Sequence, residues 1–224
     1  MEPGEPGREP DGRGIRVGVL ARRRLTRVEQ VVEFPGELGP VRVDDDGTEL
    51  TTLGRAGLRV RVTVAGTTVD VVTCHLKSKL LSFPGGRFTP RDEGERARYA
   101  VYALHRRAAE AAAVRSYVTT TQLLHGPPGS EIGSGGFDRP DKGDGQRLWN
   151  LAPLIPAEDR FTRVYRGRRE LIDHLLVSRA LVDAVDEVGT VDIGTTSTGD
   201  DPRRRRDEPV SDHRPVVATF RPSA

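Results

Sequence analysis

Alternating apolar and polar positions predict strands in both halves of the chain. Runs rich in Val, Leu, Ile and Thr have the period of two that is typical of strands. They lie at about 15–21, 28–33, 58–64, 67–75, 160–165, 170–177 and 216–221. Gly66-Thr67 predicts a tight hairpin between the strands at 58–64 and 67–75, because a short turn favours glycine.

A long helix is predicted between the two groups of strands. Thr89-Pro90-Arg91-Asp92 marks its start, and the carboxylates of Asp92, Glu93 and Glu95 favour its first turn. Its alanine-rich body continues to about Val114. A second, short helix is predicted at 179–183. Strands grouped with a few helices indicate an α/β fold.

The domain organisation follows from length and local composition. The first 13 residues are mostly glycine, proline and charged residues, which predicts a disordered tail. The remaining residues, 14–222, are long enough for one domain with a sizeable core. A loop rich in glycine and proline is predicted at about 125–146.

Composition narrows the class of protein further. Hydrophobic residues make up 35% and charged residues 30% of the 224 residues. No apolar run approaches the roughly 20 residues of a membrane span, and no apolar leader is visible at the N-terminus. We therefore expect a cytoplasmic protein, although a lost signal segment would change that expectation. The single cysteine, Cys74, excludes an intrachain disulfide, and we expect it to be a small buried strand residue.

Basic residues gather at two places, although the net charge is only +2. Four arginines run from Arg203 to Arg206, and three more, Arg166, Arg168 and Arg169, precede the strand at 170–177. Such patches can bind nucleic-acid phosphates. Alternatively, the acidic residues on both sides of the first patch neutralise it, and it is a solvated loop.

Three short motifs carry candidate chemistry. In Ser211-Asp212-His213, Asp212 can bind a hard divalent cation and His213 can move a proton near neutral pH. Alternatively, Asp212 caps a turn and His213 is solvated. His75 ends a strand and precedes Lys77, which predicts a phosphate-binding edge. Asp173 interrupts an apolar strand, and a buried carboxylate needs a partner such as an imidazole from another strand.

The three motifs together resemble the endonuclease/exonuclease/phosphatase family of metal-dependent phosphoesterases. That family has a strand ending in His-Leu, a late Ile-Asp-His strand and a closing Ser-Asp-His. They are matched in the same order by Cys74-His75-Leu76-Lys77-Ser78, Ile172-Asp173-His174 and Ser211-Asp212-His213. Residues 14–22 also look like a family strand that ends in Ser-Arg, with Ala21 replacing the serine. The resemblance runs from about residue 14 to 220 and implies a two-sheet β-sandwich core flanked by helices, a four-layer α/β sandwich.

The resemblance also implies hydrolysis of phosphodiester or phosphomonoester bonds. It makes His213 the general base or electrostatic partner at the phosphate, oriented by Asp173, with His75 contacting the phosphate. Asp212 would belong to the metal end of the site, with Mg²⁺ or Mn²⁺ as cofactor. The substrate class stays open among DNA, RNA, nucleotide, phosphoinositide and sphingolipid.

Three further basic residues are candidates for phosphate contacts: Lys77, Arg87 and Arg168. Lys77 and Arg168 can equally be solvated surface charges. Arg87 lies in a glycine-containing segment at 81–88 that is either a ligand-binding loop or a plain strand-to-helix connection.

Parts of the family pattern are not recognisable. These are an opening Trp-Asn strand, a glutamate strand that supplies the main metal ligand, and a Gly-Asp-x-Asn strand. Gly143-Asp144-Gly145-Gln146 and Trp149-Asn150 mimic two of them, but no apolar strand precedes either, and we interpret both as loop.

The sequence therefore reads as an incomplete, apparently truncated family member with weak Mg²⁺ binding and very low turnover. The alternatives are a non-catalytic remnant that binds phosphate or nucleic acid, and a structural protein. In either case a sheet edge left open by missing strands favours self-association.

Overall fold

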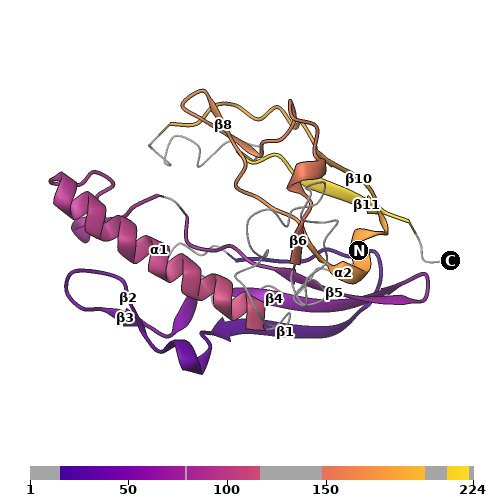
Figure 1. The fold of residues 1–224 in the computed structure, drawn as a ribbon, viewed down its shortest axis with the longest axis horizontal. Coiled ribbons are helices and arrows are strands. Elements are labelled where there is room, and N and C mark those ends of the chain that lie inside the picture. Colours follow the sequence, from indigo (N-terminus) through magenta and orange to yellow (C-terminus); the bar gives the residue numbers. More distant parts are fainter. Residues whose placement is uncertain (1–15, 79, 117–147, 200–210, 222–224) are drawn as a thin grey trace, which may run out of the picture. The chain divides into compact units, whose positions relative to one another are not determined.

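The computed structural model describes residues 16–78, 80–116, 148–199 and 211–221 (Figure 1). The chain divides into two compact units, Met1–Leu123 and Leu124–Ala224. Within the described residues the fold is mixed α/β, with one three-stranded and four two-stranded antiparallel sheets and two α-helices.

A three-stranded sheet forms the base of the first unit. Its strands are β1 (Leu25–Glu33), β4 (Thr52–Val64) and β5 (Thr67–Thr73), in the order β1-β4-β5. The predicted hairpin between β4 and β5 is confirmed. Ala65 and Gly66 form its turn with φ angles of 49° and 81°, the left-handed conformation that a type I′ hairpin turn requires at both positions.

The long helix α1 (Glu93–Ser116) is confirmed, including the signal that starts it. Asp92 Oδ1 accepts a hydrogen bond from Glu95 N at 2.7 Å, which caps an otherwise unpaired amide of the first turn. Farther along α1, Arg98 Nε lies 3.1 Å from Asp45 Oδ1. Asp45 belongs to the turn between the short strands β2 (Val41–Arg42) and β3 (Glu49–Leu50), so this ion pair ties their hairpin to the helix.

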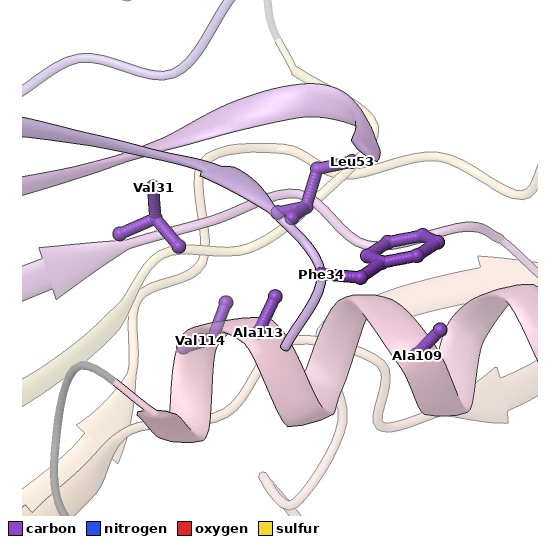
Figure 2. Packing of buried hydrophobic residues seen from close by; sticks show 6 residues of the cluster. All are labelled: Val31, Phe34, Leu53, Ala109, Ala113 and Val114. Atoms are coloured by element: carbon purple, nitrogen blue, oxygen red, sulfur yellow. The ribbon is translucent and has the colours of Figure 1, made fainter. Parts of the chain in front are cut away.

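The core of the first unit lies where α1 packs on the sheet (Figure 2). Alanines on the helix allow it to approach the strands closely, and larger apolar side chains come from β1, β4 and the segment after β1. The buried cluster consists of Val31, Phe34, Leu53, Ala109, Ala113 and Val114. Two 3₁₀ turns, η1 (Gly36–Leu38) and η2 (Pro84–Gly86), lie in the connections.

One buried carboxylate joins three segments of the first unit. Glu110 of α1 is only 2% exposed. Its Oε1 accepts from Gly54 N of β4 at 3.3 Å and from Arg106 Nε at 3.0 Å, and its Oε2 accepts from Lys77 N. Arg107 Nε also donates to Lys77 O at 2.7 Å. The segment that follows β5 is therefore fixed by α1 rather than by a strand ladder.

Short antiparallel pairs build the second unit. β6 (Leu148–Asn150) pairs with β9 (Leu176–Ser178), β7 (Arg163–Tyr165) with β8 (Arg168–Glu170), and β10 (Val185–Thr190) with β11 (Val216–Phe220). The helical segments are η4 (Ala152–Leu154) and α2 (Arg179–Val182). The buried core cluster consists of Trp149, Leu151, Ile155, Val177 and Val188.

Several predictions of local structure are wrong. Residues 16–20 are not in a strand, and residues 171–175 form a connection between β8 and β9. Trp149-Asn150 lies in strand β6 and not in a loop. Cys74 is exposed. An apolar run becomes a strand only where another strand hydrogen-bonds to it, and the pattern alone does not show that partner.

The predicted tail at 1–13, the loop at 125–146, the motif at 143–146 and the Arg203–Arg206 run lie outside the described residues. No helix in the described part of the chain is long and apolar enough to cross a membrane.

Replacing Glu110 by alanine tests the role of this carboxylate. We expect Glu110→Ala to lower the free energy of unfolding by roughly 3 kcal/mol, because it leaves Arg106 and two amides without their buried acceptor. Urea unfolding followed by far-ultraviolet circular dichroism measures this change, since α1, with 24 residues, is the longer of the described helices. Glu93→Ala on the same helix is the control, because its side chain is 83% exposed; equal losses in both variants would refute the role.

Candidate functional site

The closest approach of candidate catalytic groups lies in the second unit. Asp173 Oδ2 and His213 Nδ1 are 2.8 Å apart, although the two residues are 40 positions apart in the chain. Both side chains are partly buried, with 43% and 35% exposed. The predicted contact between this carboxylate and an imidazole is confirmed, but both residues lie in connections rather than in strands, and Asp173 is only partly buried.

Thr162 brings the two segments together. It is fully buried, and its Oγ1 accepts from Ile172 N at 3.1 Å and from Asp173 N at 3.2 Å. Its backbone oxygen accepts from Arg214 N at 2.7 Å. The segments that carry Asp173 and His213 therefore bind the same residue. Sequence reasoning missed Thr162, because a buried threonine beside a short strand has no distinguishing pattern.

Arg214 fixes the turn that carries His213. Its guanidinium lies 4.1 Å from the centre of the Phe161 ring, and its Nη2 lies 2.9 Å from Asp192 Oδ2. The side chain is only 13% exposed. A backbone hydrogen bond and an anchored side chain at the next residue leave His213 little freedom to move away from Asp173.

The contact between Asp173 and His213 shifts the pKa of both residues. The hydrogen bond with Asp173 raises the pKa of His213 above its usual value, which outweighs the opposing effect of burial. Burial by itself would raise the pKa of Asp173, but hydrogen bonds with His213 and Thr162 hold that pKa below its usual value. The arrangement therefore favours an ionised aspartate that orients the imidazole and stabilises its charged form.

Asp212, the predicted metal ligand, faces a cation instead. Its Oδ2 lies 3.8 Å from Arg163 Nε. Arg163 Nη2 also donates to Thr198 Oγ1 at 3.1 Å. Within the ranges that the structure describes, no three His, Cys, Asp or Glu side chains converge as a metal site. The described donors therefore do not make a complete Mg²⁺ or Mn²⁺ site.

Asn150 lies beside the Asp173 segment. Its Nδ2 is 3.3 Å from His174 Nδ1, and its Oδ1 accepts from Ala152 N at 3.0 Å. Leu151 N donates to Leu175 O at 2.9 Å, which continues the contact between the two segments. The sequence predicts loop at Trp149-Asn150, whereas the pairing of β6 with β9 makes Asn150 a neighbour of the site.

His75 and Lys77 lie together in the first unit, on the wall of a pocket of about 180 Å³. Arg55, Arg106 and Glu110 also line this pocket. Lys77 Nζ donates to Leu80 O at 2.6 Å. Sequence reasoning missed Arg55 and Arg106, because they come from β4 and α1, far from each other and from the His-Leu motif.

The other two candidates for phosphate contacts have different settings. Arg87 binds Glu95 at 2.8 Å and donates to Thr89 O at 2.8 Å, so it fixes its own loop against α1. Arg168 is exposed at the start of β8, opposite Tyr165. His75, Lys77 and Arg87 belong to one unit and Asp173, Asp212 and His213 to the other, so their convergence on one phosphate stays a prediction.

Comparison with protein-family models, curated proteins and solved structures found no match for this chain.

The pH dependence of stability tests the electrostatic coupling. The folded-state pKa of His213 is raised, so the stability from its pairing is present below about pH 6.5, the unfolded value, and is lost as pH rises through the folded value. We expect Asp173→Asn to lower the His213 pKa, seen by NMR titration, and to flatten this part of the pH profile of unfolding. Trp149, the only tryptophan, reports unfolding of the second unit. Asp183→Asn, at a carboxylate 78% exposed, is the control; an unchanged His213 titration in Asp173→Asn would contradict the coupling.

The role of Thr162 is tested by a pair of substitutions. Thr162→Val keeps the shape but removes the acceptor of two amides, and we expect it to lower the free energy of unfolding by about 1–3 kcal/mol. It should also lower the pKa of His213, because Asp173 is no longer fixed. Thr162→Ser keeps the hydroxyl and should restore the His213 titration. A Thr162→Val protein with the wild-type titration would show that Thr162 does not position the pair.

Proposed function

We propose that this chain is a phosphoester hydrolase of the endonuclease/exonuclease/phosphatase type in which Asp173 and His213 form the general base. The observation that supports this most directly is the 2.8 Å contact between Asp173 Oδ2 and His213 Nδ1. The two residues come from the Ile-Asp-His and Ser-Asp-His segments. Those motifs gave the resemblance, and the contact between them was predicted from it.

The chemistry of the proposed step is general-base hydrolysis. The Nδ1–H group of His213 donates a hydrogen bond to Asp173 Oδ2, so Nε2 carries no proton and accepts one from water. The water oxygen forms a bond to phosphorus while its proton passes to Nε2, and the ester P–O bond breaks. The leaving oxygen takes the electron pair as an alkoxide or phenolate and is then protonated by the imidazolium or by water. Asp173 stabilises the imidazolium that results. The raised pKa of His213 makes it a stronger base than a solvated imidazole.

Other residues are proposed to bind the substrate. His75, Lys77 and Arg168 are proposed to contact the phosphate. Arg87 is the weakest of these candidates, because Glu95 and backbone carbonyls already occupy its guanidinium. The fold over residues 14–222 is proposed to be a four-layer α/β sandwich that lacks some strands of the family. Nucleic acid is one proposed partner, and self-association through a sheet edge is another.

The metal requirement rests on the resemblance. Mg²⁺ or Mn²⁺ would neutralise charge on the phosphoryl oxygens, with Asp212 as the candidate protein ligand. Mg²⁺ is usually held by one or two carboxylates together with substrate phosphates and water. Asp212 is a single carboxylate whose charge Arg163 already offsets, so it is a poor site for Mg²⁺. We therefore expect weak metal binding and very low turnover.

The contact between Asp212 and Arg163 also supports a second candidate function. An arginine within 3.8 Å of the proposed metal ligand already offsets the charge of Asp212, which disfavours a bound cation there. In this alternative, the chain is a non-catalytic protein that binds phosphate or nucleic acid with the same surface. The two candidates differ in one respect, the presence of hydrolysis that depends on His213.

Activity of defined variants separates the two functions. We expect slow Mg²⁺- or Mn²⁺-dependent hydrolysis of a bis-aryl phosphate, and about 100-fold or greater loss in His213→Ala, because the general base is removed. Asp173→Asn should lower the rate and move the acidic limb of the pH–rate profile to lower pH, since the His213 pKa falls. Asp183→Asn is the matched control and should keep the full rate.

The assays should also include nicked and supercoiled DNA and a nucleotide panel, because the sequence leaves the substrate open. Robust hydrolysis that survives both His213→Ala and Asp173→Asn would place the reaction elsewhere in the chain. Binding of these substrates without any hydrolysis would favour the non-catalytic function.

A further inference from the structure

The ring of Phe161 contacts two guanidinium groups in the second unit. Arg169 Cζ lies 4.4 Å from the centre of the ring, and Arg214 Cζ lies 4.1 Å from it. Both distances are well inside the roughly 6 Å within which a cation is attracted to the face of an aromatic ring. Phe161 is only 4% exposed. Because water screens buried contacts little, the attraction is stronger here than at an exposed ring.

The two arginines belong to the two segments that carry the catalytic candidates. Arg214 directly follows His213 in the chain. Arg169 lies in β8, four residues before Asp173. The residue after the phenylalanine is Thr162, whose hydroxyl and carbonyl oxygens accept hydrogen bonds from the same two segments. The phenylalanine and the threonine therefore join these segments in two ways, through an aromatic ring and through hydrogen bonds.

Each guanidinium also has a second contact that fixes it over the ring. Arg214 Nη2 lies 2.9 Å from Asp192 Oδ2. Arg169 Nη1 donates to Glu158 O at 2.8 Å. The planar groups therefore have little freedom to leave the ring. Arg169 has structural partners, which sets it apart from the basic patch that the sequence predicts to bind nucleic-acid phosphates.

Burial alone does not require an aromatic side chain at this position. A leucine also fills a buried site, but it has no π face to attract a cation. The first unit provides a comparison, because Phe83 is likewise 4% exposed and its ring centre lies 5.7 Å from Arg87 Cζ. The same substitution at the two phenylalanines therefore separates a local effect on the site from a general loss of apolar burial.

We propose that Phe161 is a positioning residue for the Asp173–His213 pair, with its ring fixing both segments through Arg169 and Arg214. Its effect on hydrolysis rests on the proposed function, whereas its effect on the geometry of the two segments does not. The ring acts on the pair through its neighbours and is not itself a catalytic group.

Amide hydrogen exchange of the full-length chain, followed by NMR, tests the proposal without requiring hydrolysis. The reporter is the Arg214 amide, which donates to Thr162 O at 2.7 Å. The reference is the Leu151 amide, which donates to Leu175 O at 2.9 Å in the same unit. In Phe161→Leu we expect the reporter to exchange roughly three- to tenfold faster relative to the reference, because the ring no longer attracts the guanidinium.

Three further variants make the result specific. Phe161→Tyr keeps the π face and should restore the wild-type ratio of exchange rates. Phe83→Leu removes an equally buried ring from the first unit and should leave the ratio unchanged. Arg169→Gln is at an exposed position and removes the contact on the β8 side. It should speed exchange of the Asp173 amide, which donates to a threonine hydroxyl in that segment's anchor.

Kinetics adds a second readout where hydrolysis is measurable. Phe161→Leu should lower kcat and leave KM unchanged, because a positioning residue affects the reaction step and not substrate binding. If the wild-type chain shows no hydrolysis, the hydrolytic proposal fails and the exchange ratio alone decides this one. The positioning role is overturned if Phe161→Leu keeps the wild-type ratio, or if Phe83→Leu or Phe161→Tyr raises the ratio as much as Phe161→Leu does.

Discussion

The positions of Asp173 and His213 depend on the hydrogen bonds of one buried residue, Thr162. A fully buried hydroxyl and peptide group must find hydrogen-bond partners, because an unpaired polar group away from water is costly. Thr162 finds them in the amides of Ile172, Asp173 and Arg214. These amides belong to the two segments that carry the catalytic candidates. The connection between β8 and β9 has no strand ladder, so the hydrogen bonds to Thr162 fix the backbone at Asp173 instead.

The first unit uses the same principle with a charged residue. Glu110 is buried and takes its partners from Gly54, Lys77 and Arg106. These contacts place the segment after β5 against α1, beside the pocket that Lys77 and Arg106 line. In both units, therefore, a buried polar group fixes the segments that carry the candidate residues.

How far the sequence could predict these features depended on how local each signal was. The β4–β5 hairpin and the start of α1 follow from Gly66 and Asp92, whose effects act within a few residues. The contact of Asp173 with His213 follows from the resemblance, and the position of Asp173 in an apolar run indicates only that this carboxylate needs some partner. Strand β6, the contacts of Thr162 and the lining by Arg55 and Arg106 arise from pairing between distant segments, which hydrophobic periodicity does not encode. The strand predicted at 15–21 failed for the same reason.

The central claim is that Asp173 and His213 act as one unit on a phosphate ester. A double-mutant cycle in kcat/KM, with His213→Ala, Asp173→Asn and both together, tests it most directly. Residues that act as a unit lose their contribution together. The account predicts that the double variant is no slower than His213→Ala alone. Losses that multiply, or wild-type activity no higher than that of the double variant, would contradict it.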